Sequence, residues 1–205
     1  MKERPIIFDA KSVRAILAGG KTQTRRVVTH GGDSFWTHPG WRPTVRNGHI
    51  TEWSTEELVV DKKLTPKPHR CPHGLPGDRL WVREAWYVQP ELWQVNHGPQ
   101  PRAYAECSPA NQVEDYVWKP AMFMPRWASR ITLQIVHVRL QRVQEICDWE
   151  AMCEGVKLPE RTVTMYHGLW RDEYALRWDD LNAKRGFPWS ANPWVWVLEF
   201  KQAQG

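Results

Sequence analysis

The chain has 205 residues, of which 41% are hydrophobic and 25% are charged, with a net charge of +5. This composition permits a packed core and excludes wholesale disorder, and the mild positive charge suits an anionic partner such as nucleic acid. No apolar run approaches the roughly 18 residues that cross a bilayer, and the first residues lack the pattern of a signal peptide, so we expect a cytoplasmic protein.

The first elements in the chain predict a strand, a short helix and a tight turn. Residues 6–8 form a short β-like run, and Asp9 is a suitable N-cap for the helix that follows. Two glycines, Gly19 and Gly20, then end the helix. Lys21 and Thr24 therefore lie just past a helix C-terminus, on a tight connection.

A lysine and a threonine three residues apart can aim an amine and a hydroxyl at one point. A threonine hydroxyl becomes a nucleophile only when a base removes its proton. Lys21 could be that base if burial or a cationic neighbour lowers its pKa, and Arg25 and Arg26 add positive potential beside it. The alternative is a solvated lysine followed by a threonine, Thr24, that only shapes the turn.

A second informative stretch is the strand predicted after the Pro-Gly-Asp turn at 76–78. Strand alternation places Glu84 on the same face as Leu80 and Val82, directed toward the core. An unpaired buried carboxylate is costly, so Glu84 requires a cationic or hydrogen-bonding partner. Two partners are open: an arginine in a structural ion pair, or Lys21.

The later part of the chain predicts two strands and two helices. Residues 130–143 form a long strand whose alternation slips by one residue, which indicates a bulge of the kind found at barrel corners. Short and long helices are expected at 148–154 and 169–184, and residues 194–200 read as a buried strand. This order favours an α+β fold, a mixed β-barrel with flanking helices.

The cysteines and histidines do not define a metal site. Four scattered cysteines are too few for a disulfide framework, so reduced thiols are expected. His69, Cys71 and His73 offer three possible ligands on one loop, and His97 or Cys107 could complete them, but no second cluster follows at a usual zinc spacing. Packing of this loop is the alternative, and we assign neither a metal nor a cofactor.

Two motifs resemble a known family. Gly19, Lys21, Thr24 and Arg26 fit the GxKxxTxR signature of the ASCH domain, and residues 76–84 resemble that family's second block. Residues 124–133 and 192–197 are similar to stretches of the larger, tryptophan-rich ASCH proteins of phages and prophages. The resemblance implies a PUA-like β-barrel, a fold associated with RNA binding, spanning residues 1–205 as a single domain.

The resemblance also implies an activity. Small bacterial ASCH proteins include amidohydrolases that remove the acetyl group from N4-acetylcytidine, and their catalytic lysine, threonine and glutamate correspond to Lys21, Thr24 and Glu84. The implied mechanism is attack of the Thr24 hydroxyl on the amide carbonyl with Lys21 as base, while Glu84 orients Lys21 or passes a proton. For binding a nucleoside or modified-base substrate we expect Arg26, Arg25, Arg83, Trp81 and Arg130.

The chain is longer than the minimal amidohydrolases, with insertions at about 29–75 and 88–127. These insertions could narrow the pocket, enlarge it, or convert it to a nucleic-acid platform. The alternative function is therefore an RNA-binding or single-strand-binding module, or a ribonuclease, in which Lys21, Arg25, Arg26 and Arg130 hold phosphates. The run of cations around Trp127 fits such a surface, and a solvated strand entrance explains it equally well.

Overall fold

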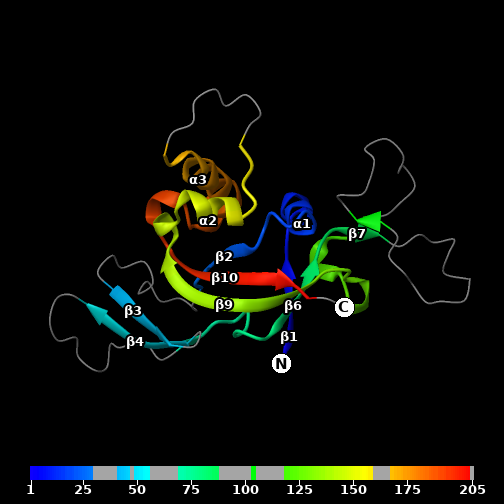
Figure 1. The fold of residues 1–205 in the computed structure, drawn as a ribbon, viewed down its shortest axis with the longest axis horizontal. Coiled ribbons are helices and arrows are strands. Elements are labelled where there is room, and N and C mark those ends of the chain that lie inside the picture. Colours follow the sequence, from blue (N-terminus) through cyan, green and yellow to red (C-terminus); the bar gives the residue numbers. More distant parts are fainter. Residues whose placement is uncertain are drawn as a thin grey trace, which may run out of the picture.

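The computed structural model describes residues 1–29, 41–46, 49–55, 69–87, 103–104, 118–158 and 167–203. Its centre is a five-stranded mixed sheet with the strand order β1-β6-β9-β10-β2 (Figure 1). The parallel pair is β1 (Glu3–Ile7) with β6 (Arg79–Arg83), and the other neighbours are antiparallel. The remaining three strands of this sheet are β9 (Thr132–Arg142), β10 (Trp194–Gln202) and β2 (Gln23–Val27).

Among the described residues three α-helices accompany the sheet: α1 (Ala10–Leu17), α2 (Asp148–Cys153) and α3 (Leu169–Asn182). Short strands make two further sheets: β3 (Trp41–Arg46), β4 (His49–Thr55) and β5 (His69–Arg70), then β7 (Trp86–Tyr87) with β8 (Ala103–Tyr104). Five 3-10 turns are described: η4 (Ala121–Phe123), η5 (Arg126–Ala128), η6 (Val143–Glu145), η7 (Ala183–Arg185) and η8 (Trp189–Ala191). The expected α+β class is confirmed.

Strand β10 is buried on both faces, which explains its almost continuous apolar sequence. Its even-numbered residues, from Trp194 to Phe200, pack in the cluster that includes Val13 and Ile16 of α1. On its other face Val195 and Val197 pack in the second cluster, which includes Tyr174 of α3. The strand therefore contributes side chains to both clusters.

The expected slip in the long strand is present as a bulge. The register between β9 and β10 shifts between Glu199 and Phe200, whose partners are His137 and Ile135. The intervening Val136 is 52% exposed. A bulge bends its strand, and β9 curves strongly along β10 (Figure 1).

The sheet does not close into the expected barrel within the described ranges, because β1 and β2 remain its two edges. A side chain spans the gap instead: Nη2 of Arg26 on β2 donates a 2.6 Å hydrogen bond to the carbonyl oxygen of Ile7 on β1. Much of the two expected insertions lies outside the described residues, and the single-domain organisation stays a prediction. The described part of the chain contains no helix long and apolar enough to cross a membrane.

Two aspartates fix how the helices begin. Asp9 accepts a 2.7 Å hydrogen bond from the Ser12 amide and caps α1, as expected. Asp148, the first residue of α2, accepts hydrogen bonds from the amides of Gly168 and Arg171 at the start of α3. This contact joins the two helices that carry several side chains of the site.

Candidate active site

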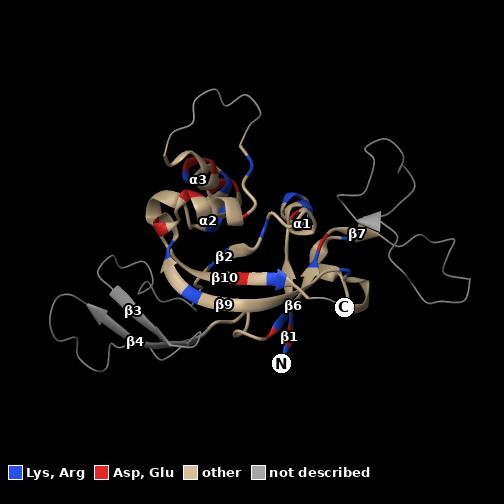
Figure 2. Ribbon diagram, viewed as in Figure 1, with Lys and Arg blue, Asp and Glu red and all other residues tan. Residues whose placement is uncertain are grey.

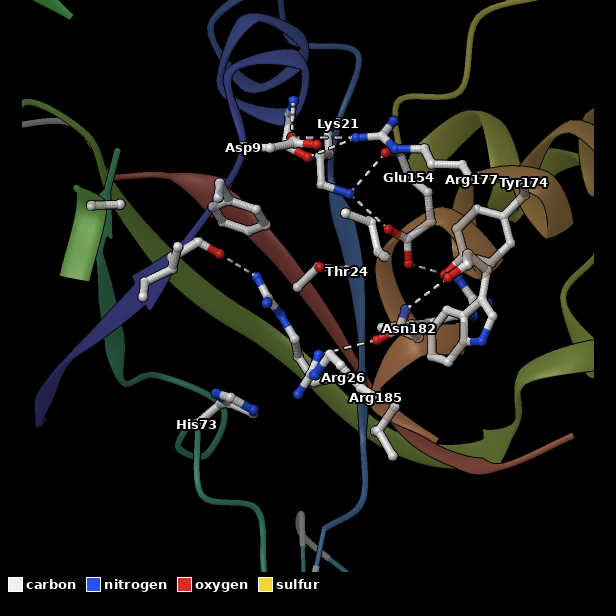
Figure 3. Close-up of a pocket in the computed structure, with 18 of the residues that line it drawn as sticks. Asp9, Lys21, Thr24, Arg26, His73, Glu154, Tyr174, Arg177, Asn182 and Arg185 are labelled. Atoms are coloured by element: carbon white, nitrogen blue, oxygen red, sulfur yellow. Dashed lines mark hydrogen bonds and ion pairs between the residues drawn. The ribbon is translucent and has the colours of Figure 1, made fainter. Parts of the chain in front are cut away.

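The Lys21–Thr24 turn opens onto a cavity of about 650 Å³. Side chains from the β1–α1 junction, β2, the end of α2 and α3 line it (Figure 3). Figure 2 shows acidic and basic positions interspersed on α3, which supplies part of the wall. The polar members of the lining are Asp9, Ser12, Lys21, Thr24, Arg25, Arg26, Thr29, His73, Glu154, Tyr174, Arg177, Asn182 and Arg185.

Lys21 is buried, with a relative exposure of 5%. Its Nζ donates to both the carbonyl oxygen and Oε2 of Glu154, each at 2.7 Å. Burial lowers the pKa of Lys21, the carboxylate of Glu154 opposes this, and the charges of Arg177 and Arg26 lower the pKa further. The lysine is therefore biased toward the neutral form that a general base requires.

The backbone brings Glu154 to Lys21. An isolated antiparallel bridge joins these two residues, and the Thr22 amide donates to the carbonyl oxygen of Cys153 at 2.8 Å. Gly155 follows with a φ of +80°, and a Cβ there would lie 2.8 Å from the Cβ of Ala15. Glycine is thus required both by the left-handed conformation and by the close approach to α1.

Glu154 is shared between two cations. Its Oε1 accepts a 3.1 Å hydrogen bond from Nη1 of Arg25, while its Oε2 accepts from Lys21. Arg25 also donates to Glu150 at 2.9 Å and to Gln23 at 3.2 Å, and its side chain is fully buried. Arg25 therefore holds the carboxylate in place and is not available to contact a substrate directly.

Thr24 lies between the Lys21–Glu154 pair and Arg26 in the cavity (Figure 3). Its relative exposure is 4%, and within the described ranges no side chain engages its hydroxyl. The strand pairing of Thr24 with Leu198 fixes the backbone that carries this hydroxyl. The structure thus brings Lys21 and Thr24 to one cavity, as the turn predicted.

Other polar groups complete the wall. Nη2 of Arg177 donates to the Ser12 hydroxyl at 2.8 Å and lies 3.5 Å from Oδ1 of Asp9. Burial raises the pKa of the Tyr174 phenol, which stays protonated. Burial, helped by nearby arginines, lowers the pKa of His73 to about 4, so its imidazole is neutral near pH 7.

Glu84 does not meet Lys21. It is 1% exposed, and its two oxygens accept hydrogen bonds of 3.0 Å each from Nε and Nη2 of Arg130. The sequence allowed either an arginine or Lys21 as the partner of Glu84, and in the structure the partner is an arginine. Burial raises the pKa of Glu84, and Arg130 opposes that rise. Neither residue lines the described wall of the cavity.

Two more expected substrate contacts lie elsewhere. The guanidinium carbon of Arg83 lies 4.6 Å from the ring centroid of Trp81, and Arg83 donates to the carbonyl oxygen of Met122. Trp81 is 8% exposed and packs in this position rather than at the cavity. Of the five expected binding residues, Arg25 and Arg26 line the cavity and Arg83, Trp81 and Arg130 do not.

The loop around Cys71 does not form a metal centre with the described side chains. Burial raises the pKa of the Cys71 thiol to about 11, so the thiol is protonated near pH 7. Across the described ranges no group of three or more histidine, cysteine or acidic side chains is placed to hold a metal. His73 instead lines the cavity.

Sequence reasoning missed Glu154, Arg177, Tyr174 and Arg185 as site residues, and it considered His73 only as a possible metal ligand. Glu154 carried a usable signal, because it ends a short predicted helix and precedes a glycine, which is how a chain turns back sharply. The contact between Arg177 of α3 and Ser12 of α1 spans 165 residues and left no local pattern. Only the tertiary structure reveals it.

Comparisons with known proteins give one likeness. No protein-family model and no curated protein matches the chain. A solved structure described as the ASCH domain from Lactobacillus crispatus JV V101 is similar at 10% sequence identity, with a TM-score of 0.40. The alignment covers 98% of this chain and 79% of that structure.

Proposed function

We propose that this chain is an ASCH-type amidohydrolase that removes the acyl group from N4-acylated cytosine nucleosides or related modified bases. The observation that carries the proposal is the buried Lys21, held by Glu154 and biased toward its neutral form, in one cavity with the Thr24 hydroxyl. The family assignment rests on the motif around Lys21. A phage-type origin remains part of the same proposal.

In the proposed reaction neutral Lys21 takes the proton of the Thr24 hydroxyl, whose oxygen attacks the amide carbonyl. Collapse of the tetrahedral intermediate breaks the carbon–nitrogen bond, and the lysine ammonium returns the proton to the departing amine. Water then attacks the acyl-threonine ester, again with Lys21 as base, and releases the carboxylic acid. No cofactor takes part in this scheme.

Glu154 replaces Glu84 in this scheme as the carboxylate of the triad. Its distance of 2.7 Å from Nζ of Lys21 allows it to orient the amine and to stabilise the transient ammonium. Glu84 is 1% exposed and is bound at both oxygens by Arg130, which suits a structural role.

Release of cytidine from N4-acetylcytidine by the purified protein tests the proposal. We expect Thr24→Ala to lower kcat/KM by at least about a hundredfold, Thr24→Ser to retain part of the activity, and no acyl-enzyme to form in Thr24→Ala by mass spectrometry. Thr22→Ala is the matched control, because Thr22 is exposed on the same turn. Full activity in Thr24→Ala would exclude the threonine nucleophile.

A nucleic-acid-binding module is the second candidate function, and one observation favours it. Met122, Phe123 and Trp127 are 60%, 66% and 51% exposed, and Arg126 lies within the same pair of 3-10 turns. Exposed aromatic rings beside a cation suit stacking of unpaired bases. Binding of a single-stranded oligonucleotide that weakens steeply with salt and is lost in Trp127→Ala would support this function.

A further inference from the structure

The cavity wall carries more positive than negative charge. Five cationic side chains among the described lining residues face two carboxylates: Lys21, Arg25, Arg26, Arg177 and Arg185 against Asp9 and Glu154. Three of the cations have carboxylate partners, since Lys21 and Arg25 share Glu154 and Arg177 contacts Asp9. Arg25 also pairs with Glu150 outside the wall, and within the described ranges no ion pair is found for the other two, Arg26 and Arg185.

Arg26 and Arg185 bind neutral groups. Nη2 of Arg26 donates to the carbonyl oxygen of Ile7 at 2.6 Å, and Nη1 of Arg185 donates to Oδ1 of Asn182 at 3.1 Å. The Nε of Arg26 is buried and has no hydrogen-bond partner among the residues that the structure describes. Each guanidinium therefore retains donors that an anion could use.

The two arginines lie within electrostatic reach of each other. Burial is the main cause that lowers the pKa of Arg26; the charge of Glu154 opposes this, and the charge of Arg185 lowers the pKa further. Figure 3 draws Arg185 beside Arg26, with His73 near the same end of the cavity. Because this imidazole is neutral near pH 7, it can donate or accept a hydrogen bond there.

Two like charges at one end of a cavity repel each other, weakly here because Arg185 is exposed, and an anion placed between them removes that cost. Phosphate suits such a pair because a guanidinium presents two parallel donors to its oxygens. The presence of Arg185 also has a structural explanation, because a cation near the C-terminus of a helix such as α3 is favourable. That reason does not account for the unused donors of Arg26 on β2.

We propose that the substrate carries a phosphate group that binds between Arg26 and Arg185, so that the site takes acylated cytidine nucleotides in preference to free nucleosides. The acyl group then lies at Lys21 and Thr24 and the phosphate at the other end of the cavity, whose volume of about 650 Å³ is within the range of ligand pockets. This inference rests on the proposed function for the acyl group. The phosphate belongs either to a mononucleotide or to a polynucleotide backbone.

The kinetic test compares N4-acetylcytidine, its 5′-monophosphate and a short oligonucleotide that contains one N4-acetylcytidine. We expect kcat/KM to be at least about tenfold higher for a phosphate-bearing substrate, and Arg185→Gln to reduce that ratio toward one. Lys184→Gln is the matched control, because Lys184 is exposed, adjacent and not part of the described wall. A preference for the mononucleotide or for the oligonucleotide identifies the source of the phosphate.

Equal kcat/KM for all three substrates, or a preference that survives Arg185→Gln, would overturn the inference. Calorimetric titration with cytidine and cytidine 5′-monophosphate separates it from the proposed function. One outcome is that the monophosphate binds more tightly than cytidine, that this difference depends on Arg185, and that no acylated cytidine is hydrolysed. This outcome supports the phosphate site and refutes the amidohydrolase. Hydrolysis without a phosphate preference in either rate or binding refutes the phosphate site and supports the amidohydrolase.

Discussion

Replacing the two partners of the Lys21–Glu154 pair is expected to cost unequal amounts of stability. In Lys21→Met the carboxylate of Glu154 keeps the guanidinium of Arg25 at 3.1 Å, and an apolar chain of similar length fills the space. In Glu154→Leu the buried ammonium of Lys21 keeps only the backbone carbonyl oxygen of position 154, at 2.7 Å. The second change leaves a buried charge without a counter-charge.

The expected size of each effect follows from these contacts. Removing one partner of a buried pair costs about 3–5 kcal/mol when the remaining charge is uncompensated, which is our expectation for Glu154→Leu. Lys21→Met loses two charge-assisted hydrogen bonds but recovers the desolvation of the ammonium, so we expect about 1–2 kcal/mol. The two free energies of unfolding should therefore differ by about 2 kcal/mol or more.

Urea unfolding at several pH values measures this difference. Because the folded protein lowers the pKa of Lys21, the unfolded chain binds more protons, and this contribution to stability increases as pH rises toward 10.5. Glu154→Leu removes the group that opposes the lowering, so its stability should rise with pH more steeply than that of the parent protein. Equal costs, or a larger cost for Lys21→Met, would refute the idea that Arg25 compensates Glu154.

Three further predictions address other parts of the site. Glu84→Gln should lower the urea midpoint, because it weakens the paired hydrogen bonds with Arg130, and should leave kcat/KM within about threefold; loss of activity without loss of stability would restore Glu84 as a catalytic group. The kcat/KM for N4-acetylcytidine should increase with pH and level off below 10.5 as Lys21 loses its proton, and a rate that is flat or falls would exclude a lysine base. Gly155→Ala should destabilise the fold by about 2 kcal/mol or more, because of its φ of +80° and the 2.8 Å approach to Ala15, and unfolding curves that match the parent protein would contradict this geometry.

Local patterns in the sequence predicted the elements better than the contacts between them. The N-cap at Asp9, the helix at α2, the buried strand β10 and the bulge near Val136 each follow from residues within a few positions of one another. Alternation also showed correctly that Glu84 is buried and needs a partner. Alternation did not show whether the partner of Glu84 is an arginine or Lys21.

That choice depends on topology. Lys21 and Glu154 are separated by 133 positions, and they meet because β2 pairs with β10 while α2 packs against β10. Helical spacing puts Tyr174 and Leu181 on one face of α3, yet Tyr174 is buried whereas Leu181 is 53% exposed and lies at the cavity. A side chain at a cavity mouth has the same sequence signature as one in the core.

Lys21 must be held in place by a carboxylate and must still have a lowered pKa. The sharing of one carboxylate between two cations allows both. A lysine paired with a carboxylate of its own would keep its proton, because the pair stabilises the charged form. Here Arg25 occupies the other oxygen of Glu154, and Glu150 in turn holds Arg25 from α2. Arg139 of β9 contacts Glu150 as well, so the network is fixed by the sheet and a helix together. Glu154 can therefore orient Lys21 firmly while burial still lowers its pKa.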